Sequence, residues 1–177
     1  MFPDLTRDDV FRLETPHLWL RWPRASDIPP IRRLGGRTRE SEIRVGPSRA
    51  VDWQGFILDA RARNAGGEGL EMVATRKRTQ ALVGLIGLRA VGEEALLQCQ
   101  MDRDDLSEAL RAMIEATFAF TDMRRVAAVA GDGAAARLLA AHGFQPSREA
   151  ERYTRERPAR NRPAFAQTLS GACLAAE

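Results

Sequence analysis

Lysine is almost absent from this 177-residue sequence, and long apolar runs are missing as well. Lys77 is the only lysine, so arginine carries nearly all of the positive charge, and the formal net charge is only +3. No aromatic residues alternate with the arginines, as they do in proteins that stack single-stranded bases. We interpret the arginine clusters as solvated surface and expect no nucleic-acid partner.

Cysteine is scarce, and its two positions exclude a disulfide framework. Cys99 and Cys173 have no histidine or cysteine nearby at metal-ligand spacing, so no metal site is expected. Cys99 is predicted to be a small buried side chain of a strand. No apolar run approaches the length of a membrane span, and the acidic N-terminal residues do not resemble a secretory signal. These absences predict a cytoplasmic protein without a membrane partner.

The size and composition favour one globular domain. A chain of 177 residues is long enough for one domain with a substantial core. Its 44% hydrophobic and 29% charged residues are close to ordinary globular values. We therefore expect a single domain over residues 1–171 and a frayed tail over residues 172–177.

The first half of the chain predicts one strand, two helices and three strands. Apolar and polar residues alternate over 17–22, which is typical of a half-buried strand. Helical spacing follows over 26–34 and again from Val51-Asp52, and a glycine-rich turn is expected over 64–69. The next strands are expected over 70–75, 82–88 and 95–101, and their short connections make them antiparallel.

The second half predicts a helix over 106–122, a short strand over 125–130 and a helix over 132–142. The long helix begins with Asp105-Leu-Ser-Glu108, which fits a capping box. Two further strands, over 149–155 and 165–169, would form a final hairpin. The order β-α-α-β-β-β-α-β-α-β-β, with a parallel crossover around the long helix, predicts an α/β fold with a mixed sheet.

Five local sequences in this order resemble the GNAT superfamily of acetyltransferases. They are Glu14-Thr-Pro-His-Leu-Trp-Leu-Arg21, Val83-Gly-Leu-Ile-Gly-Leu-Arg89, the helix Ala109–Phe118, the strand Arg124-Arg-Val126, and Ala135-Arg-Leu-Leu running to His-Gly-Phe144. They are most similar to the branch of ribosomal-protein alanine acetyltransferases. The resemblance implies a GNAT-like fold, acetyl-CoA as donor, and transfer to a primary amine of a protein N-terminus or small molecule. Relatives often form homodimers.

The resemblance also implies where the cofactor lies. In the family, backbone N–H groups at the start of the long helix bind the pyrophosphate, and the strand before that helix holds the pantetheine arm. The positions that this assigns to acetyl-CoA are Gln100, Met101, Asp102, Arg103, Ser107 and, at the start of the last helix, Asp132.

The chemistry of transfer needs a proton acceptor and a proton donor. Glu94, or Glu93 through a water molecule, could accept the amine proton. Tyr153 is the only tyrosine and therefore the only phenol that could protonate the departing thiolate. A half-buried strand tyrosine is an equally good interpretation of Tyr153.

The predicted phosphate-binding join departs from the family pattern. It has no glycine, and Asp104, Asp105 and Glu108 crowd the start of the helix, where carboxylates compete with phosphate. This feature favours an alternative function, a catalytically degenerate GNAT-fold binding or interaction module that no longer uses acetyl-CoA. Among the candidate functions, nucleic-acid binding ranks third, after acetyl transfer and the binding module.

Four more residues have an ordinary structural interpretation. His142 ends an apolar helix, where the helix dipole favours a charged histidine. His17 is expected on the surface or in a structural contact. Trp53 and Phe56 are expected to pack in the core, although in the family their helix flanks the acceptor site.

Overall fold

The computed structural model describes residues 11–35, 42–43, 52–101, 103–131 and 133–158. The predicted strand over 165–169 and the tail over 172–177 therefore lie outside the described residues. The same holds for Asp102 and Asp132. None of the described helices is long and apolar enough to cross a membrane.

The elements follow the predicted order, with three short additions. In chain order they are β1 (Arg12–Glu14), β2 (Leu18–Arg21), the 3₁₀ turn η1 (Ala25–Asp27), α1 (Ile28–Gly35), β3 (Glu42–Ile43), α2 (Trp53–Gly66), β4 (Gly69–Arg76), β5 (Leu82–Val91), β6 (Glu94–Met101), α3 (Arg103–Phe120), β7 (Arg125–Val129), α4 (Gly133–Ala141), β8 (Gln145–Pro146) and β9 (Arg152–Glu156).

Within the described residues, nine strands form one mixed sheet. Eight of them lie in the order β1-β2-β4-β5-β6-β7-β9-β8, and β3 pairs with β6. All pairs are antiparallel except β6 with β7, which are parallel and connected through α3. The α/β fold class with a parallel crossover is thus confirmed.

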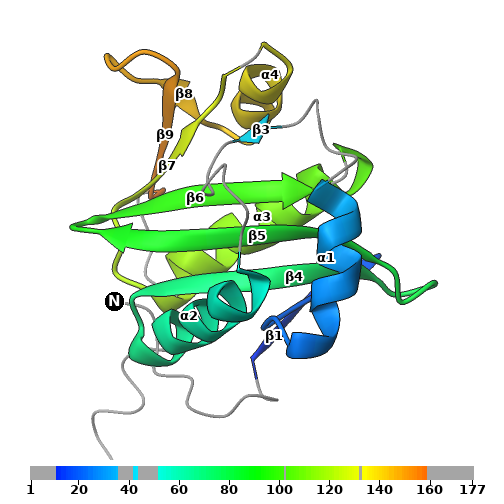
Figure 1. Ribbon diagram of the computed structural model, residues 1–177. Helices are drawn as coiled ribbons and strands as arrows, with labels where there is room; N and C mark the ends of the chain where they lie inside the picture. Colours follow the sequence, from blue (N-terminus) through cyan, green and yellow to red (C-terminus); the bar gives the residue numbers. More distant parts are fainter. Residues whose placement is uncertain (1–10, 36–41, 44–51, 102, 132, 159–177) are drawn as a thin grey trace, which may run out of the picture.

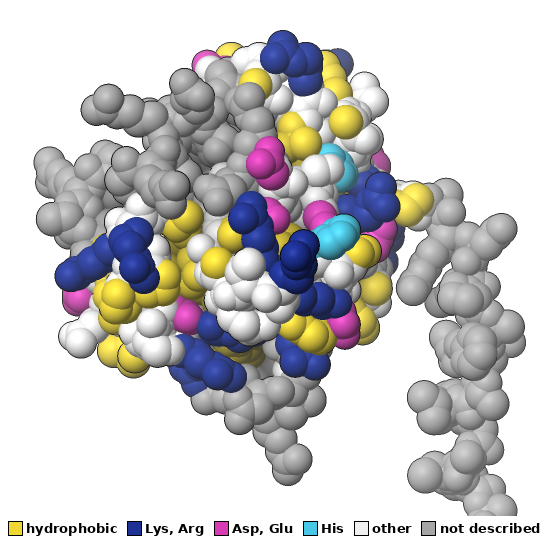
Figure 2. Space-filling view, turned by 90° about the vertical axis from the view of Figure 1, so that its right-hand side faces the viewer, with side chains coloured by type: hydrophobic (Ala, Val, Ile, Leu, Met, Phe, Trp, Pro, Cys, Tyr) yellow, Lys and Arg dark blue, Asp and Glu magenta, His cyan; other side chains and the backbone are white. Residues whose placement is uncertain are grey.

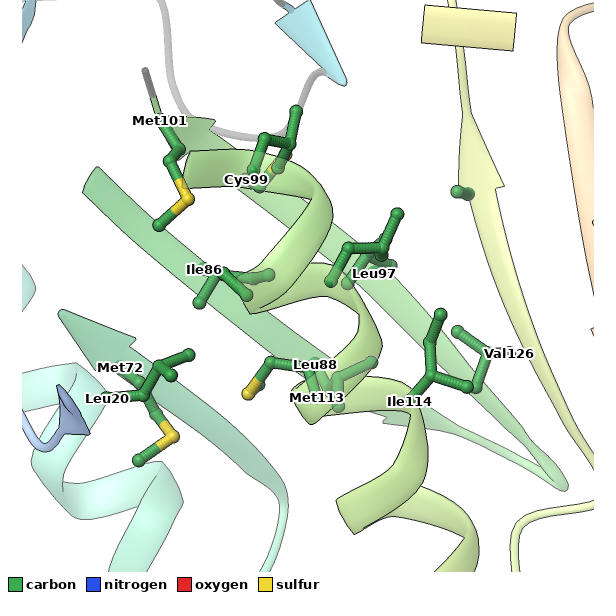
Figure 3. Packing of buried hydrophobic residues seen from close by; sticks show 14 of the residues in the cluster. Leu20, Met72, Ile86, Leu88, Leu97, Cys99, Met101, Met113, Ile114 and Val126 are labelled. Atoms are coloured by element: carbon green, nitrogen blue, oxygen red, sulfur yellow. The ribbon is translucent and has the colours of Figure 1, made fainter. Parts of the chain in front are cut away.

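The sheet separates two layers of helices (Figure 1). Helices α1 and α2 pack on one face, against β5 and β4, and α3 packs on the other. The main core lies between the sheet and α3, where Met72, Leu88 and Leu97 point towards Met113 and Ile114 (Figure 3). Each fully buried side chain of this size contributes about 1.5–3 kcal/mol to folding. Helix α4 joins the same core on the α3 side.

The N-terminal region contains a hairpin where one strand was predicted. Strand β1 pairs antiparallel with β2, and Thr15 closes the turn between them. Its backbone N–H donates to the Leu18 carbonyl at 3.1 Å, and its hydroxyl oxygen accepts from the Leu18 N–H at 2.9 Å. A three-residue strand is too short to show a periodic pattern in the sequence.

Helix α2 continues to Gly66 and so includes the first three residues of the turn predicted over 64–69. Gly67 then ends the helix in the left-handed conformation, with φ of +69°. Asn64, which favoured a turn in the sequence, is fully buried in the helix because its amide bonds to strand β4.

The predicted pairing of the last two strands stays a prediction, since 165–169 lies outside the described residues, but a pairing that was not predicted is present before it. Strand β9 pairs with β7 and with the two-residue strand β8, which lies only a few residues after α4. Pairing between β8 and β9 was not expected, because Gln145-Pro146 is exposed and too short to carry a strand pattern.

Candidate functional site

Strands β6 and β7 run side by side for only three residue pairs. Residues 94–96 of β6 pair with residues 125–127 of β7. Beyond Leu96, β6 continues beside β5, whereas β7 continues beside β9, so the two strands diverge (Figure 1). Divergence inside a sheet exposes strand edges to another chain or ligand.

The edge of β6 that faces this divergence carries β3. Glu42 pairs with Gln100, and Ile43 pairs with Cys99. The opposite edge of the same two β6 residues pairs with β5, so β3 must lie on the β7 side. The end of β6 therefore accepts an extended segment from the connection between α1 and α2.

Helix α3 begins one residue after β6 ends. Met101 is the last residue of β6 and Arg103 the first of α3, so Asp102 alone makes the join. The first backbone N–H groups of a helix have no partner within the helix and attract anions. Four of the predicted cofactor positions thus lie at the end of β6 or in the first turns of α3: Gln100, Met101, Arg103 and Ser107.

Asp105 lies inside the first turn of α3 and does not cap it, so the predicted capping box is wrong. Its carboxylate accepts hydrogen bonds from Arg76 of β4, with Nη2 and Nε at 2.6 Å and 3.0 Å from Oδ2. This forked ion pair neutralises one of the carboxylates at the start of the helix.

Glu108, the other half of the predicted box, binds His17. Its Oε1 accepts from the His17 backbone N–H at 2.8 Å, and its Oε2 lies 3.0 Å from Nδ1. Burial of Glu108 opposes ionisation, but hydrogen bonds with Thr15 and His17 outweigh it and hold the pKa below its ordinary value. The His17 side chain is 80% exposed, which confirms the expected surface position.

Ser107 of α3 and His142, just after α4, lie 2.9 Å apart between Oγ and Nε2. Figure 2 shows both histidines of the chain on one face of the molecule, with acidic side chains between them. Burial, helped by Arg111 and Arg155, lowers the pKa of His142. Desolvation and two arginines thus act against a charged His142, in the direction opposite to the dipole effect that the sequence suggested.

Glu94 lies at the other end of β6 from the join. It forms ion pairs with Arg125 of β7 and Arg152 of β9. Seven residues of strand, roughly 23 Å, separate it from Met101. The structure therefore does not bring Glu94 together with the predicted cofactor positions.

Tyr153 lies on β9 opposite Ala128 and packs against the core on the α3 side of the sheet. Because side chains alternate along a strand, Arg152 points to the other face, where it binds Glu94. Tyr153 and Glu94 thus lie on opposite faces of the sheet.

Trp53 and Phe56 form an edge-to-face pair at the start of α2, with ring centroids 5.8 Å apart. Both are partly exposed. The prediction that they pack in the core is wrong: both lie in the first turn of α2, and the first buried residue of this helix is Ile57.

Sequence reasoning missed Glu71 of β4. Its carboxylate lies in the space above Gly87 of β5, and its side chain is only 13% exposed. The one signal in the sequence was a glycine inside a predicted strand, which indicates a close approach without naming the partner. In the described part of the chain, no group of three His, Cys, Asp or Glu side chains could hold a metal ion.

No protein-family model and no curated protein matches the sequence. Among solved structures, the ribosomal-protein-S5-alanine acetyltransferase from Vibrio fischeri aligns with a TM-score of 0.70 at 17% identity, over 84% of this chain and 97% of that one. RimJ from Mycobacterium smegmatis, in complex with CoA-disulfide, aligns with a TM-score of 0.67 at 17% identity, over 88% and 90%.

RimL, a ribosomal L7/L12 alpha-N-protein acetyltransferase in complex with coenzyme A, aligns with a TM-score of 0.63 at 14% identity, over 82% and 98%. In each case nearly the whole of the solved chain is matched. The order of strands, the parallel crossover through α3 and these alignments agree: this chain has the GNAT acetyltransferase fold.

Proposed function

We propose that this protein is an acetyl-CoA-dependent N-acetyltransferase that acts on a primary amine. The observation that carries the proposal is the divergence of β6 from β7 next to the start of α3. This arrangement offers strand edges for an extended arm and unpaired helix N–H groups for its phosphates. The likeness to RimJ and RimL, both solved with forms of CoA, supports it.

The cofactor contacts are proposed at Gln100, Met101, Arg103 and Ser107, at the end of β6 and the start of α3. Asp102 and Asp132, which lie outside the described residues, stay proposed contacts on the family resemblance. The carboxylates at the start of α3 repel an anionic ligand less than the sequence suggested. Arg76 neutralises Asp105, and His17 binds Glu108. Because β3 lies on the edge of β6 where the pantetheine arm would run, binding in this arrangement displaces β3.

The proposed reaction is direct transfer. Acetyl-CoA supplies a thioester, the acceptor nitrogen attacks its carbonyl carbon, and the carbon–sulfur bond breaks. Tyr153 remains the proposed proton donor to the thiolate. Two arginines already bind Glu94 at the far end of β6, which does not favour Glu94 as the proton acceptor.

The acceptor is proposed to be the N-terminal amine of a peptide or protein. The similar solved structures include acetyltransferases named for ribosomal-protein substrates. The aromatic pair Trp53 and Phe56, partly exposed at the start of α2, offers an apolar surface for the first side chains of such a peptide. The cytoplasm is the proposed compartment.

The first test is thermal melting of the purified protein with increasing acetyl-CoA or CoA. A ligand at about 100 times its Kd adds roughly 2.7 kcal/mol to the free energy of unfolding, which raises the melting temperature by several degrees. Transfer is then measured as release of free CoA thiol with peptides that begin with alanine or serine. No change in melting at millimolar ligand would reject the enzyme and favour the binding-module alternative.

A further inference from the structure

Glu71 is a buried carboxylate on the α2 side of the sheet. Its neighbours Leu70 and Met72 belong to the core on the α3 side. Because side chains alternate along a strand, Glu71 must point to the opposite face, towards α2. Its side chain is 13% exposed, although a glutamate is rarely buried without a specific partner.

The Glu71 carboxylate extends from β4 across β5. A Cβ atom built on Gly87 would lie 2.1 Å from Oε2 and 2.7 Å from Cδ of Glu71, so the carboxylate fills the space that a side chain at Gly87 would need. Gly87 pairs with Glu71 on one side and with Gln98 of β6 on the other. Cross-strand partners lie about 4.5–5.5 Å apart, so the carboxylate is one strand spacing from Gln98.

Gln98 marks the place where β6 leaves β7. It lies two residues after Leu96, the last β6 residue paired with β7. Leu97 and Cys99 face the α3 core, so Gln98 and Glu71 share the other face. The Glu71 carboxylate is thus directed towards the point of divergence, beside the edge of β6 along which the proposed function runs the pantetheine arm.

The carboxylate is only partly satisfied by its surroundings. It accepts no hydrogen bond from any side chain or backbone group in the described ranges, and Nη2 of Arg63 is 3.7 Å from Oε1. Nε of Arg63 is itself buried without a partner in those ranges. Burial raises the pKa of Glu71, and the charges of Arg63 and Arg89 oppose this rise. A carboxylate of this kind is well suited to accept a proton.

We propose that Glu71 is the proton acceptor for the attacking amine. The inference rests on the proposed acetyl transfer. As the amine nitrogen bonds to the thioester carbon, its N–H proton moves to the Glu71 carboxylate, directly or through one water molecule. The electron pair of the broken carbon–sulfur bond leaves on sulfur, and Glu71 later releases its proton to solvent.

The test compares wild-type protein with E71Q over a range of pH, using acetyl-CoA and a peptide that begins with alanine or serine. The wild-type kcat/KM should fall at acidic pH, because only the ionised carboxylate accepts a proton. E71Q should lower kcat/KM about 10²–10³-fold and lose the part of this fall that the carboxylate causes, so that only protonation of the acceptor amine still lowers the rate at acidic pH. The melting shift with CoA should stay unchanged, because Glu71 does not contact the proposed phosphate site.

E68Q is the matched control, because Glu68 is an exposed glutamate three residues away. It should retain the wild-type rate and pH profile. G87A is a second variant that keeps the carboxylate but pushes it aside, and it should lower kcat/KM about 10-fold or more even if E71Q folds poorly. The three atoms nearest to the added methyl group all belong to the flexible end of Glu71.

Two results separate the inference from the proposed function. If wild-type protein transfers acetyl and both E71Q and G87A match its rate at every pH, the assignment of Glu71 is wrong while the acetyltransferase stands. If wild-type protein transfers no acetyl to any peptide, the proposed function fails and the inference fails with it.

Discussion

Asn64 of α2 binds both backbone groups of Glu71 of β4. Its Nδ2 donates to the Glu71 carbonyl at 2.8 Å, and its Oδ1 accepts from the Glu71 N–H at 2.7 Å. Strand β2, which pairs with β4 further along, ends at Arg21 opposite Val73. At Glu71 the edge of β4 therefore has no pairing with β2, and the Asn64 side chain binds the backbone there instead.

Asn64→Ala should lower the free energy of unfolding by about 2–4 kcal/mol, because two backbone groups lose their partners in a buried site. Urea denaturation measures this as a lower midpoint with an unchanged slope. Asp59→Ala, at an exposed position of the same helix, should change the stability by less than about 0.5 kcal/mol. Equal effects of the two changes would contradict the structural role of Asn64.

Arg157, just after β9, holds the end of α3. Its guanidinium donates to the carbonyls of Phe118 and Met123, both at 2.9 Å, and to that of Thr121. Arg157→Lys keeps the charge but cannot reach three carbonyls in a fixed fork, so we expect a loss of about 1–3 kcal/mol. The exposed Arg148→Lys is the control. Thermal melting without ligand measures both, and an unaltered Arg157→Lys protein would refute the prediction.

Asp104 is the exposed carboxylate in the first turn of α3. If phosphates bind at this helix start, Asp104→Asn should tighten CoA binding several-fold at low salt, because it removes a repelling charge worth roughly 0.5–1 kcal/mol. The gain should shrink at high salt. Isothermal titration gives the Kd, with Asp59→Asn as control; weaker binding by Asp104→Asn would place the phosphates elsewhere.

We expect His142 to make the free energy of unfolding depend on pH. Its pKa is lowered in the folded protein, so the unfolded chain binds a proton more readily. Its contribution to stability is therefore present above the unfolded pKa of about 6.5 and is lost as pH falls towards the folded value. His142→Gln should reduce the fall in melting temperature on acidification below about pH 6.5. Ser107→Ala keeps the imidazole and should retain most of that fall.

We expect burial to protect the Cys99 thiol from chemical modification in the folded protein. Burial raises its pKa to about 12, so almost no thiolate is present at neutral pH. In a Cys173→Ser background, Cys99 should remain unreactive towards a thiol reagent in native buffer and react fully in denaturant. Rapid labelling of the native protein would contradict the burial of Cys99 in the core.

Most of the fold could be predicted because its signals are local. The alternation in β6 and the helical spacing in α3 each repeat within a few residues, and the short connections of β4, β5 and β6 allow only antiparallel neighbours. The predictions failed where an element was too short for a pattern, as in β1 and β8. They also failed at Asn64, where a tertiary contact outweighed the local preference of asparagine for a turn.

The site was less predictable, because its chemistry depends on residues that meet across the fold. The sequence by itself determined the order of the longer elements and the presence of a short join after β6, although the first residue of α3 was predicted three residues too late. Only the tertiary structure decided that Ser107 meets His142, that two arginines hold Glu94, and that Glu71 lies above Gly87. Periodicity reports which side of an element is buried, whereas pairing between distant segments is set by the packing of the whole core.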